Sequence, residues 1–158
     1  MKTVLVTNGQ QRKSLAVVRS LGIRNLNVIV AEETIFNPSA FSKYCTKALR
    51  CPNAKKEPDK YYHWLKKTII KYKCDVLFPM DDDVLEVVMK HSKEILSLCN
   101  VMLPQMESYF IANDKSNATK LAEKAQVSCP KTVYPRIMDN ISGFIEGMQF
   151  PLVINRTL

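Results

Sequence analysis

Glycine is scarce in this sequence, which has four glycines in 158 residues, and the turn after the first apolar segment contains only Gly9. The G-x-G-x-x-G pattern, which lets a dinucleotide pyrophosphate approach the backbone of a Rossmann domain, is therefore absent. No apolar run approaches the ~20 residues of a membrane span, and the N-terminal apolar run is too short for a secretory signal. We therefore expect no standard dinucleotide site, no membrane partner and a cytoplasmic location.

Cysteine and histidine also lack the spacings that bind metals. The five cysteines are odd in number and widely spaced, and none forms a C-x-x-C pair. Neither His63 nor His91 has a partner at metal-ligand spacing. This pattern indicates reduced cysteines and ordinary histidines, and it predicts no zinc or redox centre.

Basic residues outnumber acidic ones, 23 to 15, for a net charge of +8. Much of this charge lies in a predicted helix at residues 59–73, where lysines recur on the face opposite Tyr61, Leu65 and Ile69. Such a pattern is typical of a solvated face above a core face. No RNA-binding aromatic motif, helix-turn-helix or zinc-finger spacing accompanies it, so we expect no specific nucleic-acid partner. A basic nucleic-acid-binding protein, with affinity that falls steeply with salt, is a lesser alternative.

Strand-like apolar segments alternate with helix-like segments over roughly the first hundred residues. Strands are expected at residues 3–7, 27–31, 47–51, 75–79 and 100–103, and helices at 14–21, 59–73 and 83–91. Gly22 is well placed to cap the first helix at its C-terminus. Continuous apolar strands separated by helices indicate a parallel sheet covered on both faces. The fold class is therefore α/β, a Rossmann-like doubly wound parallel sheet.

The alternation changes after Pro104. We expect a helix from Asn113 to about Ala125, capped by Asn113 or Asp114, and then a strand at 132–134, a helix at 140–148 and a strand at 152–155. This tail is too short to form an independent core. The prediction is a first domain at residues 1–112 and an incomplete α+β segment, the beginning of a second domain, at 113–158.

Two loops should lie where ligands of an open parallel sheet bind, beyond the carboxyl ends of its strands. After the first strand come Asn8, Gly9, Gln10 and Arg12. Free backbone N–H groups, the helix dipole and the Arg12 charge would together bind an anion or substrate there. A plain strand-to-helix turn explains the same residues equally well.

Acidic residues follow two other strands. Asp81, Asp82 and Asp83 come after the fourth strand, and carboxylates are ligands that Mg²⁺ prefers. Acids at a helix N-terminus also cap the helix and complement its dipole, which is the favoured interpretation, so we assign no metal site. Glu32 and Glu33 follow the second strand, where an acid holds the ribose of dinucleotides in other proteins, but without the glycine pattern solvated loop acids are favoured.

Taken in order, four segments resemble the ATP-grasp superfamily of carboxylate-amine ligases and carbamoyl-phosphate-synthase-like proteins. Residues 4–16 (VLVTNGQQRKSLA) look like the opening of its pre-ATP-grasp domain, and residues 78–83 (FPMDDD) like its fourth strand and turn. Residues 111–115 (IANDK) look like the transition into the ATP-grasp fold, and residues 150–154 (FPLVI) like its next strand. The resemblance covers the whole chain.

The resemblance implies a reaction in which ATP, with Mg²⁺, phosphorylates a small carboxylate substrate and an amine displaces the phosphate. It implies that Lys115 contacts the nucleotide, although a solvated lysine is the alternative. The final strand of the family should end in Lys-Pro, but here Asn155 occupies the lysine position and Arg156 follows. Because asparagine carries no charge, ATP and Mg²⁺ are expected for a complete family member and not as tightly bound ligands of this chain.

The sequence thus predicts the N-terminal part of an ATP-dependent ligase-like protein, inactive without its catalytic half. One base lost from Lys-Pro codons would give Asn-Arg, so a frameshift and a deliberately truncated divergent protein are both open accounts of the ending. A non-catalytic Rossmann-like module that binds a small anion through residues 8–12 is the functional alternative. An exposed second-domain segment also favours association, so a homo-oligomer is one expected state.

Overall fold

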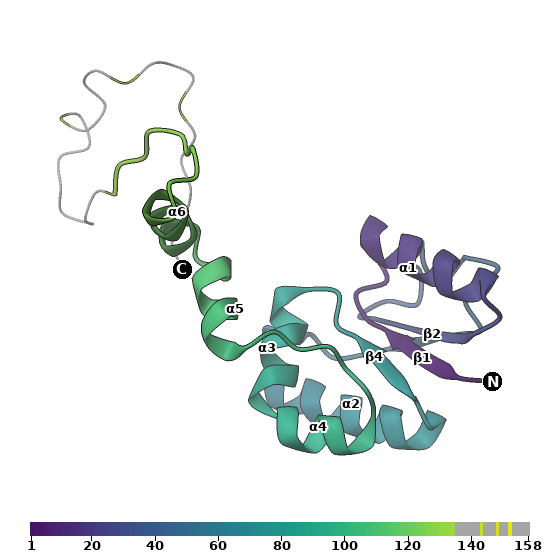
Figure 1. The fold of residues 1–158 in the computed structure, drawn as a ribbon. Helices are drawn as coiled ribbons and strands as arrows, with labels where there is room; N and C mark the ends of the chain where they lie inside the picture. Colours follow the sequence, from purple (N-terminus) through teal and green to yellow (C-terminus); the bar gives the residue numbers. More distant parts are fainter. Residues whose placement is uncertain (135–142, 144–147, 149–151, 153–158) are drawn as a thin grey trace. The chain divides into compact units, whose positions relative to one another are not determined.

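The computed structural model describes residues 1–134 together with residues 143, 148 and 152 (Figure 1). The chain divides into two compact units, Met1–Leu103 and Pro104–Leu158. The sequence places its domain boundary later, after residue 112, and that boundary stays a prediction. No helix in the described ranges combines the length and the hydropathy of a bilayer-spanning segment.

A four-stranded parallel sheet forms the centre of the first unit, in the order β3-β2-β1-β4. Its strands are β1 (Thr3–Val6), β2 (Asn27–Glu32), β3 (Lys47–Arg50) and β4 (Val76–Phe78). Leu5 of β1 pairs with Ile29 on one side and with Leu77 on the other. The predicted α/β class is confirmed, and each strand lies within two residues of its predicted range.

Helices cover both faces of this sheet because side chains alternate along each strand. Leu5, Ile29 and Leu77 pack in the core cluster that includes α2 (Pro58–Tyr72), α3 (Asp82–Lys90) and α4 (Ser92–Leu98). Val4 and Val6 point the other way and pack with Val18 of α1 (Arg12–Ile23). Figure 1 shows α1 on one side of the sheet and α2 and α4 on the other, as a doubly wound fold requires.

The α2 helix follows its sequence pattern closely. Pro58 stands in its first turn, where the missing N–H leaves no intrahelical bond unmade, and Lys73 ends it in a left-handed conformation. Tyr61, Leu65 and Ile69 are almost completely buried, which confirms the core face predicted from their spacing. The lysines on the opposite face of the helix are exposed to solvent.

Gly22 does not cap the first helix, so that prediction was wrong. It lies inside α1, and Arg24 is the C-cap. A Cβ atom at residue 22 would lie 2.3 Å from the Cβ of Tyr44. The glycine is therefore explained by the close approach of the later loop to the helix and not by the end of the helix.

The predicted fifth strand was also wrong. Asn100 forms only an isolated parallel bridge with Val76, and residues 101–103 form no regular strand. The helix α4 precedes this bridge and was not predicted. Met102, which a buried strand would have covered, is 94% exposed.

The second unit contains α5 (Met106–Asn113) and α6 (Lys115–Lys124). The helix predicted from Asn113 matches α6, and Asp114 is its N-cap because its side chain accepts a hydrogen bond from Asn117 N at 3.0 Å. The α5 helix was not predicted. Residues 132–134 form no strand, contrary to the prediction. The helix predicted at 140–148 and the strand at 152–155 fall largely outside the described residues.

Candidate functional site

The two candidate loops of the first unit lie at the switch point of the sheet. β1 and β4 are neighbours, but β1 leads to α1 on one face whereas β4 leads to α3 on the other. Ligands of open α/β sheets bind beyond the strand ends at such a reversal. The structure thus brings together residues 8–13 and residues 80–83, which are far apart in the sequence.

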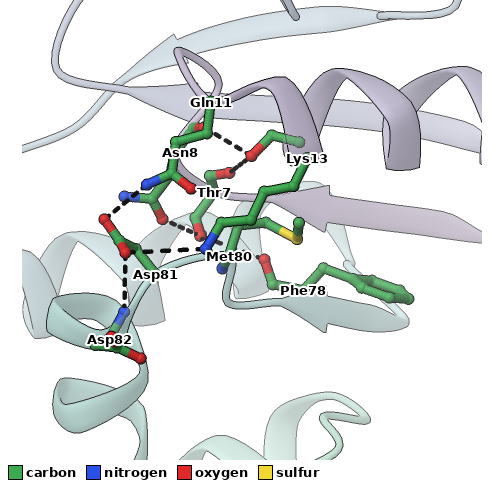
Figure 2. Close-up of polar contacts among 9 residues, drawn as sticks. Thr7, Asn8, Gln11, Lys13, Phe78, Met80, Asp81 and Asp82 are labelled. Atoms are coloured by element: carbon green, nitrogen blue, oxygen red, sulfur yellow. Dashed lines mark hydrogen bonds and ion pairs between the residues drawn. The ribbon is translucent and has the colours of Figure 1, made fainter. Parts of the chain in front are cut away.

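Thr7 joins the two loops, as Figure 2 shows. Its backbone N–H donates to the Phe78 carbonyl at 3.1 Å. Its hydroxyl donates to Asn8 Oδ1 at 2.6 Å and accepts from Met80 N at 2.9 Å. Because Thr7 is almost completely buried, these bonds fix the ends of β1 and β4 relative to each other.

Asn8 turns the chain from β1 into α1. Its φ of 53° is left-handed, a conformation that asparagine tolerates better than most residues. The Asn8 carbonyl accepts from Gln11 N at 3.0 Å and from Ser14 Oγ at 2.7 Å. Ser14 is fully buried and also donates to the Thr7 carbonyl at 3.1 Å. The turn is therefore rigidly oriented by the first residues of the helix that it starts.

Gly9 packs so closely against Asn37 and Val30 that it leaves no space for a side chain. A Cβ atom there would lie 2.5 Å from Asn37 Oδ1 and 2.6 Å from Val30 Cγ1. The Gly9 N–H donates to the Ala31 carbonyl, and its own carbonyl accepts from Ser39 N, both at 3.2 Å. The glycine is thus required by the packing of the loop between β2 and β3, which places that loop beside the site.

Glu32, at the end of β2, also belongs to this edge of the sheet. One of its carboxylate oxygens accepts from Gln10 N at 2.9 Å and the other from Glu33 N at 2.8 Å. These two backbone bonds account for the acid at this position without a ribose. Glu32 therefore holds the β1–α1 loop against the end of β2.

Asp81 links the two loops from the other side. It is the N-cap of α3 and accepts from Asp82 N at 3.2 Å. It also accepts from Gln11 Nε2 at 2.7 Å, and Lys13 Nζ lies 4.0 Å from its carboxylate (Figure 2). The donors of the first loop therefore already bind a carboxylate, the one that the protein itself supplies.

Asp82 and Asp83 lie in the first turn of α3, where their charges complement the helix dipole. Asp83 pairs with Lys55 at 3.8 Å. In the part of the chain that the structure describes, no three or more histidine, cysteine or acidic side chains are grouped to hold a metal ion.

The N-terminus of α1 carries the positive end of the helix dipole, next to residues that contact the carboxylates of Glu32 and Asp81. Its first turn contains no acidic residue, and the N-cap Gln11 makes no capping hydrogen bond with its side chain. Arg12 and Gln10 are exposed beside it. The helix dipole, the first-turn N–H groups and the Arg12 charge together suit an anionic group.

The cysteines near the candidate site and at the cavity are not suited to act as nucleophiles. Near the site, burial and then the charges of Glu32 and Glu33 raise the pKa of Cys51 to about 12. A cavity of about 450 Å³ beside Lys73 and Asp75 is lined by Cys74 and Cys99, whose pKa values burial raises to about 11. These thiols stay protonated at neutral pH and are poor nucleophiles.

The remaining site residues from the sequence lie elsewhere. Lys115 is the first residue of α6 in the second unit and is exposed. Asn155 lies outside the described residues. The sequence places Thr7 at the start of the first candidate loop, but it does not predict that Thr7 joins the two loops or that Asn37 and Ser39 meet Gly9. Thr7 had a weak signal, a polar residue directly after an apolar strand, whereas nothing local indicates that Asn37 and Ser39 meet Gly9.

No protein-family model matches this sequence, and no curated protein matches it. Solved structures do match. A single-chain, multi-domain long-chain acyl-CoA carboxylase matches with a TM-score of 0.63 and 15% identity, over 93% of this chain and 15% of that chain. The biotin carboxylase domain of a single-chain bacterial carboxylase matches with a TM-score of 0.63 and 12% identity, over 92% of this chain and 34% of that chain.

A third match is N5-carboxyaminoimidazole ribonucleotide synthetase from Thermotoga maritima. Its TM-score is 0.56 and its identity 17%, over 96% of this chain and 37% of that chain. The chain thus spans well under half the length of each of these proteins. At such identities the likeness shows the fold, and it confirms the Rossmann-like fold that the sequence predicts.

Proposed function

We propose that this chain, whose fold is that of a part of ATP-grasp carboxylases and synthetases, is the substrate-side domain and opening segment of an ATP-dependent ligase or carboxylase. Its role is to bind a small carboxylate at residues 8–12. The observation that carries the role is the position of this loop. It begins a helix at the switch point of the sheet, beside an exposed arginine, and its Gln11 side chain already donates to the Asp81 carboxylate.

The residues of this chain would orient the substrate. The first-turn N–H groups of α1 and the Arg12 guanidinium would receive the carboxylate. Thr7 and Glu32 would hold the loop so that little ordering is needed on binding. In a complete protein of this kind ATP with Mg²⁺ would supply the phosphoryl group that activates the carboxylate, and Lys115 would contact the nucleotide phosphates. The chain by itself is proposed to be cytoplasmic and inactive, with a second domain that starts after residue 112.

Calorimetry on the whole chain tests this proposal. Propionate is expected to bind saturably, and Mg-ATP is not expected to bind tightly. Arg12→Gln should weaken propionate binding roughly tenfold, the usual scale of a lost charge-assisted hydrogen bond. Arg19→Gln removes the same charge from an exposed position of the same helix and should leave the affinity nearly unchanged.

Three results bear against the proposal. Tight Mg-ATP binding would contradict the assignment of this chain to the substrate side alone. Equal effects of Arg12→Gln and Arg19→Gln would show only general attraction by the basic chain. If the coding sequence after codon 158 yields no ATP-grasp motifs in any frame, the non-catalytic anion-binding module becomes the better account.

A further inference from the structure

Cys74 and Cys99 lie together at the amino ends of the strands, away from the candidate site. Cys74 follows the end of α2 and Cys99 follows the end of α4. Each backbone N–H still donates to the helix that it leaves, to the Ile69 and Ile95 carbonyls, both at 3.0 Å. Both side chains belong to the core cluster that includes α2 and α4, and both line the same cavity of about 450 Å³. The structure thus places two free thiols on the wall of one cavity.

The backbone pairing of these two segments brings the cysteines within the range of a disulfide. Val76 and Asn100 form a parallel bridge, and Asn100 N donates to the Asp75 carbonyl at 2.9 Å. In this register Asp75 lies opposite Cys99, and Cys74 is one residue before Asp75. With ~4.8 Å between strands and ~3.3 Å of rise per residue, such a diagonal separates two Cα atoms by roughly 6 Å. Disulfides join cysteines whose Cα atoms are about 4.4–6.8 Å apart.

The two thiols also share one environment. Cys74 is 3% exposed and Cys99 is 6% exposed. Burial raises the pKa of Cys74 most, and the neighbouring Cys99 and then Asp75 raise it further. One thiol affects the ionisation of another only when the two are close, which agrees with the register. Because the raised pKa keeps both thiols protonated at neutral pH, the pair reacts slowly and needs sustained oxidation.

We propose that Cys74 and Cys99 are an oxidisable pair that hydrogen peroxide converts into an intramolecular disulfide. One thiolate attacks a peroxide oxygen, the O–O bond breaks, and a sulfenic acid and hydroxide are formed. The second thiolate attacks the sulfenic sulfur, the S–S bond forms, and a second hydroxide leaves. The two thiol protons convert both hydroxides to water. The protein therefore loses two electrons and two protons, and one peroxide becomes two waters.

The bond would fasten the segment after α4 to the start of β4. Asn100 of this segment forms only an isolated bridge with Val76, and Met102 beyond it is 94% exposed. Closing residues 74–99 into a loop lowers the conformational entropy of the unfolded chain, so the urea midpoint should rise by roughly 1–2 M. The inference does not depend on the carboxylate site, which lies at the other end of the strands.

Peptide mapping of the whole chain tests the pair. The five cysteines lie on five different tryptic peptides, and those of the pair are residues 74–90 and 94–115. After prolonged incubation with hydrogen peroxide and blocking of the remaining thiols with iodoacetamide, we expect these two peptides to be linked. Dithiothreitol should separate them, and no other two cysteine peptides should be linked.

Two variants serve as test and control. Cys99→Ala should abolish both the link and the rise in the urea midpoint. Cys51→Ala removes a half-buried cysteine that packs on the same core cluster, and it should keep both. The map of the wild-type chain gives an answer even if a variant fails to fold.

Four results would overturn the inference. The first is oxidation of either cysteine to sulfinic acid without a link, and the second is a link between two other cysteine peptides as the main product. The third is a link that forms only between two copies of the chain, seen as a dimer on a non-reducing gel. The fourth is a pair that stays reduced after prolonged incubation with peroxide at pH 8.5. A link that leaves the urea midpoint unchanged would exclude the fastening of the segment after α4.

Discussion

Gly9→Ala tests the packing that joins the β2–β3 loop to the proposed site. The added methyl group would lie within 2.6 Å of both Asn37 Oδ1 and Val30 Cγ1, far inside normal contact distance. Val30 is fully buried in the core beneath α1, and Asn37 makes two hydrogen bonds, so neither moves freely.

The expected loss follows from these contacts. Overpacking in a well-packed core costs about 1–3 kcal/mol. Displacing the Asn37 side chain adds about 1 kcal/mol for each hydrogen bond that it loses. We therefore expect the free energy of unfolding to fall by roughly 2–4 kcal/mol, a large part of the 5–15 kcal/mol typical of a domain.

Urea denaturation followed by circular dichroism measures this loss. With an m-value of about 1–3 kcal/mol per molar urea, the midpoint should fall by roughly 1–2 M. Val30→Ala removes one of the two clashing atoms, so the double variant should lose less than the sum of the single variants. A Gly9→Ala variant as stable as the wild type would refute the close packing of this loop.

Three further results are expected. Gly22→Ala should destabilise the protein by about 1 kcal/mol in urea denaturation despite its higher helix propensity, because the contact with Tyr44 outweighs that gain; a stabilised variant would contradict this. Thr7→Val should cost about 1–3 kcal/mol because Met80 N loses its acceptor, and Thr7→Ser should recover most of it; equal losses would exclude the hydrogen bond as the cause. Burial and then Lys90 lower the pKa of His91. As the pH falls through about 6.5, the unfolded chain therefore binds this proton before the folded protein does, and the free energy of unfolding decreases. His91→Gln should flatten this pH dependence, measured as the urea midpoint from pH 7.5 to 5, and an unchanged pH dependence would exclude His91 as its cause.

The fold was predictable where local patterns and tertiary packing agree. Residues 3–7 and 27–31 are continuous apolar runs that only a sheet covered on both faces can bury. The prediction for Gly22 was wrong because glycine is common directly after a helix. Here a glycine is needed because Tyr44, which comes much later in the sequence, packs against this position of α1. The apolar run at 101–103 looked like a strand, yet only Asn100 before it pairs with β4.

The sequence predicted where the candidate loops lie on the sheet, but not the contacts that hold their residues together. Strand ends placed residues 8–12 and Asp81 at one edge of the sheet, because parallel strands end together. The contacts of Asn37 and Ser39 with Gly9 depend on how a long loop folds back, which no local pattern encodes. For the same reason the sequence could not show that Gln11 and Lys13 bind the Asp81 carboxylate.

The central claim is that a small carboxylate binds at the switch point between β1 and β4. A titration of the isotopically labelled chain with propionate, followed by amide chemical shifts, tests it most directly. The account predicts saturable shifts at residues 8–13 and at Asp81 and Asp82, with none around the cavity at Lys73 and Asp75. Shifts confined to that cavity, or no saturable shifts at all, would contradict it.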